Sequence, residues 1–263
     1  MYIYIYAMHD SYIQRTLSRI SMASHFFFLC TLLTFSLSFH GILGALPKYV
    51  VINEAPTHGG GIKFVKVIGG IPYTQKIMRH INKFIWYKVF KQNTPADQKP
   101  LDNVTVFIKD FVGAEGIAWG NDRINISAVF LRDYPGPMSL KWIFTSLMHH
   151  EMTHIFQWNG EGKTPAPLVE GIADYTVLKA NYNPPGFNMP GSGDRWDQGY
   201  DYTARFLEYC DELVPDFVAK LNNMMRKTYD VSFFHNLTGK PVEELWKDYK
   251  AKYANKALEG IKS

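Results

Sequence analysis

Long apolar segments are scarce in this sequence, and the one clear example stands near the N-terminus. Residues 26–39 form a 14-residue run without charge. That length is short for a membrane span but suits the apolar region of a signal peptide. Two arginines precede the run and small residues follow it. We therefore assign residues 1–45 to a signal peptide, with cleavage between Ser38 and Leu46.

Two alternatives to this assignment remain open. A start at Met22 would make the residues before it an upstream extension, because the sequence from Met22 onward begins like an ordinary signal peptide. An N-terminal anchor helix is the rival interpretation of the run itself. No second long apolar run follows, so we expect no membrane-spanning helix in the mature chain.

Cysteine is almost absent. Cys30 lies inside the assigned signal peptide, and Cys210 is alone in the rest of the chain. No internal disulfide can form after cleavage, so the secreted domain must be held by its hydrophobic core, with or without a bound metal. A hydrophobic content of 46% in 263 residues is sufficient for one domain with such a core.

A strong excess of one charge is also missing. The formal net charge is +4, and charged residues make up 20% of the chain, which argues against general disorder. No dense Lys/Arg cluster alternates with aromatic residues, so we expect no nucleic-acid binding. Repeats and low-complexity tracts are absent as well, and residues 46–263 are predicted to form one domain, which we expect to be monomeric.

Strand patterns come first in this domain and helical patterns follow. Alternating apolar residues predict strands over 48–55, 60–70, 103–111 and 123–131. Apolar residues at helical spacing predict helices over 72–92, 140–158 and 168–182, and near 199–211, 213–228 and 241–257. Ser139 is a suitable N-cap for the second of these helices. The order predicts an α+β domain in which a mostly antiparallel or mixed N-terminal sheet packs on a central helix, followed by a helical C-terminal half.

The predicted helix over residues 140–158 contains the pattern H-E-x-x-H. His150 and His154 lie about 40° apart around a helix and one turn along it, so both imidazoles can bind one ion. Glu151 lies on the same side, where it can reach a water on that ion. Chance produces the pattern at on the order of 0.01 per chain. We therefore predict a hydrolytic Zn²⁺ site with Glu151 as general base, the alternative being a structural histidine pair. His149 projects away and is interpreted as a bystander.

A third ligand is expected from the next predicted helix. Glu170 and Asp174 lie four residues apart, on one face of that helix. One carboxylate can bind the ion, while the other accepts the N–H of a ligating histidine. We assign Glu170 to the metal and Asp174 to the histidine. The reverse assignment and a solvated helix face are the alternatives.

Four longer segments resemble the plant basic secretory protein family. They read HHEMTHIFQWNG (149–160), LVEGIADYTVLKANY (168–182), WDQGYDYTARFLEYC (196–210) and ELWKDYKAKY (244–253), and the resemblance extends from about Tyr49 to Tyr253. It implies a zincin-like fold and a secreted metallopeptidase with a role in plant defence, in the apoplast or cell wall. It also implies zinc at His150 and His154 with Glu151 catalytic. The E-G-x-A-D-Y block resembles that of zinc peptidases in which its first Glu is a ligand, which supports Glu170.

Peptide hydrolysis also needs a donor for the developing oxyanion. Tyr200 and Tyr202 are candidates, of which we select Tyr200, and the alternative for each is an aromatic core or surface residue. Sequons at Asn103, Asn125 and Asn236 are predicted glycan acceptors on a secreted chain. The predicted function is hydrolysis of peptide or protein substrates. The alternatives are a secreted defence-related binding protein with a vestigial zinc site and, on aromatic content, a carbohydrate hydrolase.

Overall fold

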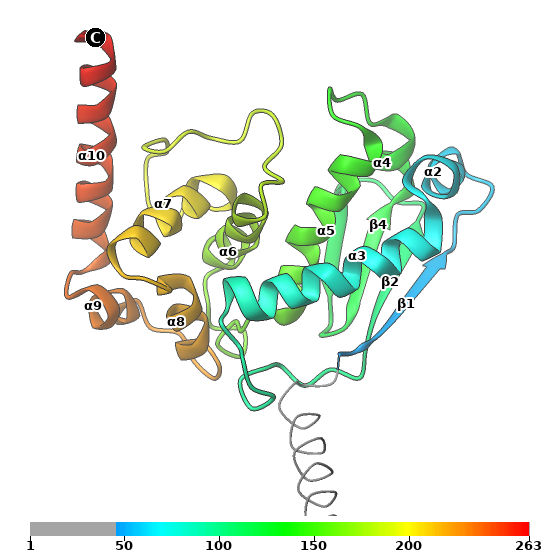
Figure 1. The fold of residues 1–263 in the computed structure, drawn as a ribbon, viewed down its shortest axis with the longest axis horizontal. Helices are drawn as coiled ribbons and strands as arrows, with labels where there is room; N and C mark the ends of the chain where they lie inside the picture. Colours follow the sequence, from blue (N-terminus) through cyan, green and yellow to red (C-terminus); the bar gives the residue numbers. More distant parts are fainter. Residues whose placement is uncertain (1–45, 263) are drawn as a thin grey trace, which may run out of the picture. The chain divides into compact units, whose positions relative to one another are not determined.

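A four-stranded sheet forms the N-terminal part of the described chain (Figure 1). The computed structural model describes residues 46–262, so the assigned signal peptide lies outside the described residues. The spatial order is β1 (Lys48–Asn53), β2 (Asn103–Lys109), β4 (Arg123–Ser127) and β3 (Gly116–Trp119). β1, β2 and β4 are parallel, whereas β3 is antiparallel to β4. The predicted mixed sheet is confirmed, and its antiparallel pairing involves only the edge strand β3 among the described strands.

Two helices pack on this sheet. α3 (Gly70–Phe84) continues into a π-helical turn, η2 (Ile85–Val89), and contacts β1, while α5 (Leu140–Phe156) contacts β3 and β4. Both helices confirm the predictions made from helical spacing. Alternate strand residues supply the sheet's side of the core, because they point to one face. Fully buried examples are Val104, Val106, Ile108, Ile124 and Ile126.

Residues 60–70 are largely helical, so the strand predicted there is wrong. Helix α2 (Gly59–Lys63) leads directly into the π-helical turn η1 (Phe64–Ile68). Phe64 and Ile68 are fully buried, four residues apart, whereas Val67 is 52% exposed. The alternation of apolar and lysine residues did not mark a buried strand face, because the residues that enter the core recur with helical spacing.

The strand predicted over residues 123–131 ends early. β4 stops at Ser127, whose hydroxyl accepts a hydrogen bond from the Phe130 N–H at 3.1 Å and caps α4 (Ala128–Asp133). A serine in this position favours helix initiation over strand continuation. Gly60 lets α2 approach α4 closely, since a Cβ at Gly60 would overlap the Ala128 carbonyl oxygen.

The C-terminal half is helical, as predicted, although α9 was not foreseen. α6 packs against both α5 and α7, which places it between the sheet-bound helix and the helices that follow. Aromatic rings that include Phe206, Phe234 and Tyr249 form the core there. The helices are α6 (Ala166–Lys179), α7 (Tyr200–Leu213), α8 (Phe217–Met224), α9 (Ser232–Thr238) and α10 (Val242–Lys262).

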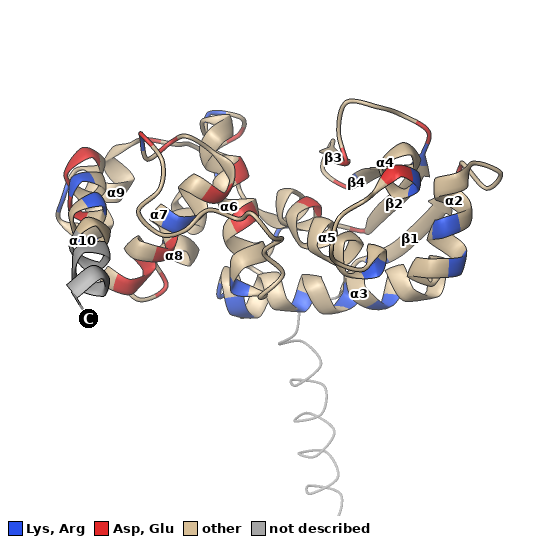
Figure 2. Ribbon diagram, turned by 90° about the horizontal axis from the view of Figure 1, so that it is seen from above, with Lys and Arg blue, Asp and Glu red and all other residues tan. Residues whose placement is uncertain are grey.

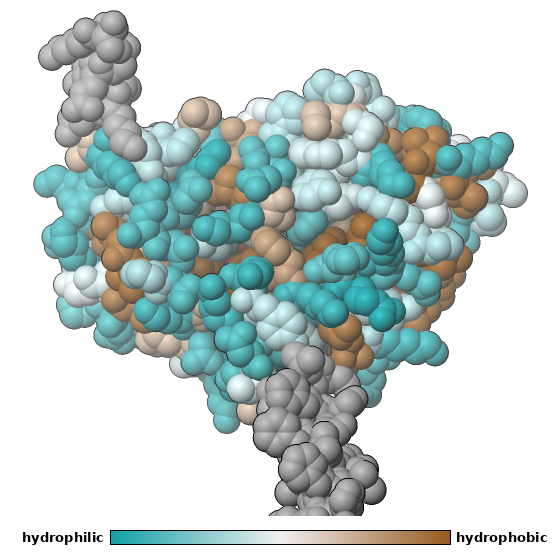
Figure 3. Space-filling view, viewed as in Figure 1, coloured by the Kyte–Doolittle hydropathy of each residue, from teal (hydrophilic) through white to brown (hydrophobic). Residues whose placement is uncertain are grey.

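The surface of the described residues is mixed in character. On the face shown in Figure 3, hydrophilic side chains surround separate apolar patches. Within residues 46–262, no helix combines the length and hydropathy needed to cross a bilayer.

Candidate metal centre and active site

Helix α5 carries the H-E-x-x-H pattern through the middle of the fold. Ser139 caps it as predicted, with its hydroxyl accepting the Trp142 N–H at 3.2 Å. The helix packs on the sheet and on α6, so it is buried on two sides. His149 turns away from the pattern and donates its Nδ1–H to the Thr145 carbonyl oxygen at 2.8 Å. The interpretation of His149 as a bystander therefore agrees with its position.

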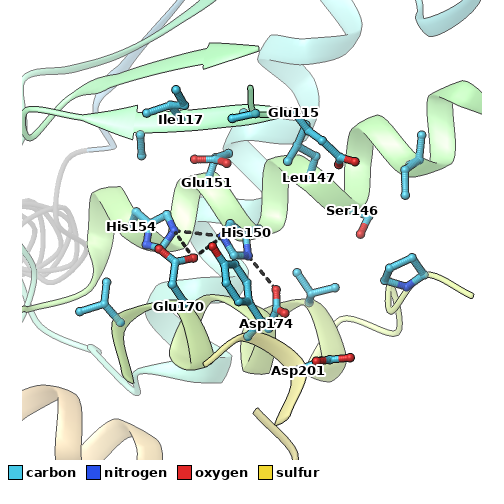
Figure 4. Close-up of a pocket in the computed structure, with 18 of the residues that line it drawn as sticks. Glu115, Ile117, Ser146, Leu147, His150, Glu151, His154, Glu170, Asp174 and Asp201 are labelled. Carbon is cyan, nitrogen blue, oxygen red and sulfur yellow. Dashed lines mark hydrogen bonds and ion pairs between the residues drawn. The ribbon is translucent and has the colours of Figure 1, made fainter. Parts of the chain in front are cut away.

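Three predicted ligands converge at one point beside α5 (Figure 4). The Nε2 atoms of His150 and His154 lie 3.1 Å apart. Oε2 of Glu170, from the neighbouring helix α6, lies 3.1 Å from the first nitrogen and 3.6 Å from the second. The three side chains form a group whose ligand atoms could hold a metal ion.

The donor set and its spacing fit zinc. Ligand bonds of about 2.0–2.1 Å in tetrahedral geometry place neighbouring ligand atoms roughly 3.4 Å apart, close to the separations within this group. Two imidazole nitrogens and one carboxylate oxygen also form a ligand set typical of catalytic zinc, which keeps a further position open. The residues present therefore fit the ion that the sequence predicts, although its identity stays a prediction.

Asp174 lies behind His150, on the side away from the convergence point. Its Oδ1 accepts a hydrogen bond from Nδ1 of His150 at 2.7 Å, which leaves Nε2 facing Glu170. Burial opposes a charge on His150, but hydrogen bonds to Asp174 and Glu170 outweigh it and raise the pKa of His150 to about 10. Burial also acts against the Glu170 carboxylate, but both histidines lower its pKa to about 2. The arrangement is the one expected for Glu170 as ligand and Asp174 as orienting partner.

Gln157 contacts Nδ1 of His154, as Asp174 contacts Nδ1 of His150, and it was not predicted from the sequence. Its Nε2 lies 2.8 Å from Nδ1 of His154, and its Oε1 is buried without a hydrogen-bond partner among the described residues. A metal on Nε2 of His154 requires a proton on Nδ1. Rotating the Gln157 amide by 180° would make the unpaired oxygen the acceptor of that proton, and it would break the hydrogen bond that Nε2 donates to the Val169 carbonyl oxygen at 3.3 Å. The signal that could have identified Gln157 is its position three residues after His154.

Glu151 lies on the sheet side of the cluster (Figure 4). Only 4% of its surface is exposed. Burial raises the pKa of Glu151, while the two histidines and the backbone of Ala118 favour its ionised form. Gly116 of β3 provides the space for this side chain, since a Cβ at Gly116 would lie 2.7 Å from Oε1 of Glu151. The carboxylate is thus fixed against the edge strand, close to the two histidines.

The structure places Tyr200 at the same site. Its ring is stacked on that of His150, with centroids 6.2 Å apart and an interplanar angle of 12°. The residue is 56% exposed and has a positive φ of 47° at the start of α7. Gly171, beside Glu170, allows α7 to approach this closely, because a Cβ there would overlap Thr203. The negative charge of Glu170 is the main cause of the raised pKa of Tyr200.

These groups line one cleft of about 910 Å³. One wall is the segment 113–118, which includes most of β3, and the other is formed by α6 and residues 184–187. α5 contributes the floor between them. An open cleft of this size beside a convergent polar group is the usual form of a ligand site.

None of the three sequons lines the cleft. Asn236 is exposed on α9, whereas Asn103 and Asn125 are only partly exposed, in β2 and β4. The Asn103 amide donates to Asp122 at 3.2 Å, and Oδ1 of Asn125 is buried without a partner among the described residues. Modification of these residues stays a prediction, and it is sterically simplest at Asn236.

Comparison with known proteins agrees with the resemblance seen in the sequence. The chain is 41% identical over 71 residues to the "Basic secretory protease" of Boswellia serrata, a match that covers 27% of this chain and 86% of that protein. No solved structure matches the chain. Residues 47–249 match the family described as "Peptidase of plants and bacteria". Because that match spans most of the sequence, the chain belongs to this family of peptidases.

Proposed function

We propose that this chain is a secreted, zinc-dependent peptidase that uses Glu151 as its general base. The observation that carries the proposal is the convergence of His150, His154 and Glu170 from two helices, with Glu151 buried beside them. The name of the relative from Boswellia serrata supports secretion. A location in the apoplast or cell wall, a role in plant defence and action as a monomer belong to the same proposal.

The protein's own groups divide the chemistry between them. His150, His154 and Glu170 would hold the ion, which supplies a Lewis acid and lowers the pKa of a bound water. Glu151 accepts a proton from the attacking water and returns it to the leaving amine. Its raised pKa suits both steps, because a base whose pKa approaches the working pH can take up and release a proton. The Tyr200 hydroxyl donates a hydrogen bond to the oxyanion.

Substrate binding is supported by the exposed edge of β3. Among the described strands, β3 pairs only with β4, and its residues Gly116–Ala118 line the cleft. An edge strand presents unpaired N–H and C=O groups, which can bind a peptide in extended conformation. A peptide held there would run alongside Glu151, so a scissile bond can be placed beside the base.

Metal analysis combined with peptide-cleavage profiling tests this function. We expect about one zinc per mature chain and cleavage that stops on chelation and returns when zinc is restored. The variant Glu151→Gln should retain zinc and lose activity. Cleavage that survives in Glu151→Gln would show that the mechanism is wrong. A zinc-loaded wild type that cleaves nothing in a broad library would favour the alternative, a secreted defence-related binding protein with a vestigial site.

A further inference from the structure

We propose that Glu115 makes the cleft selective for peptides that carry Lys or Arg near the scissile bond. The inference rests on the proposed peptidase function and names the substrate class of the same site. Among the described residues that line the cleft, none is Lys or Arg. The carboxylates that line it are Glu115, Glu151, Glu170, Asp174 and Asp201.

Three of these carboxylates are hydrogen-bonded to other residues, and a fourth, Glu151, is the proposed general base. Glu170 and Asp174 are bonded to His150, and Glu151 is buried against β3. Oδ2 of Asp201 accepts hydrogen bonds from the backbone and side-chain amides of Asn188 at 2.7 and 2.8 Å. Glu115 differs, since its side chain makes no hydrogen bond or ion pair with another described residue. Partial burial raises the pKa of Glu115 and the charge of His150 lowers it, but neither carboxylate oxygen is bonded to a described residue, so both oxygens are available to a ligand.

The position of Glu115 is set by the sheet. Its carbonyl oxygen accepts the Ser127 N–H at 2.9 Å, which ties it to the end of β4, and it directly precedes β3. The small residues Gly113 and Ala114 come before it, so the rim stays open to solvent. A peptide that pairs with the edge of β3 would pass this carboxylate within reach of its own side chains.

The surface between Glu115 and the floor of the cleft suits a long cationic side chain. Figure 4 shows Glu115 reaching toward Leu147 of α5. Ile143, one turn earlier on α5, lines the same cleft. Lys and Arg can pack an apolar stem on such a surface while the charged end remains in water beside a carboxylate. Among the described residues, Lys and Arg occur outside the cleft lining, for example along α3 (Figure 2).

The expected effect is modest, because Glu115 is exposed. An ion pair in solvent contributes at most about 1 kcal/mol, which corresponds to a roughly fivefold preference. We would measure kcat/KM with fluorogenic peptides in which one position at a time is Lys, Arg, norleucine or Glu. Wild type should prefer Lys and Arg over norleucine about fivefold at one position or more.

Variants of Glu115 test whether this residue causes the preference for Lys and Arg. In Glu115→Gln the ratio of kcat/KM between the Lys or Arg peptides and the norleucine peptide should fall to about one, and in Glu115→Lys the Glu peptides should become the preferred substrates. Glu243→Gln, on the exposed start of α10, is the control for the change in net charge and should keep the preference. A preference that is absent in wild type, or that survives in Glu115→Gln, refutes this inference alone. If wild type cleaves none of the peptides, the proposed function fails and the inference with it.

Discussion

The variant Gly116→Ala should displace the proposed general base, Glu151, without affecting metal binding. A Cβ at this position would lie 2.7 Å from Oε1 of Glu151 and 3.0 Å from its Cδ and Cγ. Comfortable contacts between such atoms begin at about 3.5 Å. In Gly116→Ala the carboxylate must therefore move by about 0.5–1 Å, or β3 must shift by a similar amount. The ligands of the predicted metal site are not among the atoms nearest that Cβ.

The rate effect follows from this displacement. A misplacement of about 1 Å costs on the order of 100-fold in rate, so kcat/KM of Gly116→Ala should fall by about 30- to 100-fold. Crowding of a packed site costs about 1–3 kcal/mol of folding free energy, a change that thermal unfolding can measure while the protein stays folded. Zinc content should remain at the wild-type level.

The assay compares kcat/KM on one fluorogenic peptide with zinc content measured on the same samples. Gly59→Ala is the matched control, because its Cβ would meet only the flexible side chain of Arg132, at 3.1 Å, outside the cleft. It should retain wild-type activity. If zinc-loaded Gly116→Ala cleaves the peptide as fast as wild type, the placement of Glu151 against β3 does not govern the reaction, and the assignment of its role fails.

Other variants examine the partners of this centre. Asp174→Asn should weaken zinc binding by about 10- to 100-fold, and Gln157→Leu by less, as measured by competition with a chelator. An unchanged zinc affinity in either variant would contradict the orienting role of that residue. Tyr200→Phe should lower kcat by about 100- to 1,000-fold with little change in KM, and an unchanged kcat would exclude the hydroxyl as oxyanion donor. Mass spectrometry of protein secreted from plant cells should find a glycan at Asn236, and an unmodified Asn236 beside occupied Asn103 and Asn125 would show that exposure in the folded chain does not decide acceptance.

The proximity of the proposed ligand residues was predictable in part because a helix fixes the geometry of each pair locally. The spacing of His150 and His154 places both rings on one face in any α-helix, and Glu170 and Asp174 share a face for the same reason. These relations depend only on residues four positions apart. Ser139 as helix cap is local in the same sense, since its hydroxyl bonds a backbone N–H three residues later.

Features that depend on tertiary packing could not be predicted from local sequence patterns. The alternation over residues 60–70 suggested a strand, but contacts with the core selected a helix in which Phe64 and Ile68 are buried. The space that Gly116 leaves for Glu151 exists only once β3 is placed beside α5. Glu115 belongs to no sequence motif, and its place in the cleft depends on how the segment before β3 packs beside α5.

The orientation of His150 argues for Glu170 rather than Asp174 as the ligand. The two ring nitrogens point in opposite directions, and Asp174 bonds Nδ1 while Nε2 faces both His154 and Glu170. The reverse assignment would require the ring to turn over, which would separate its metal-binding nitrogen from that of His154. If zinc binds as proposed, Glu170 would offset one of its positive charges as a ligand, and Asp174 would offset the other through the imidazole of His150. The negative charge of Glu151 would then not be needed to neutralise the ion. Its carboxylate would stay available to accept a proton from the water that the proposed reaction consumes.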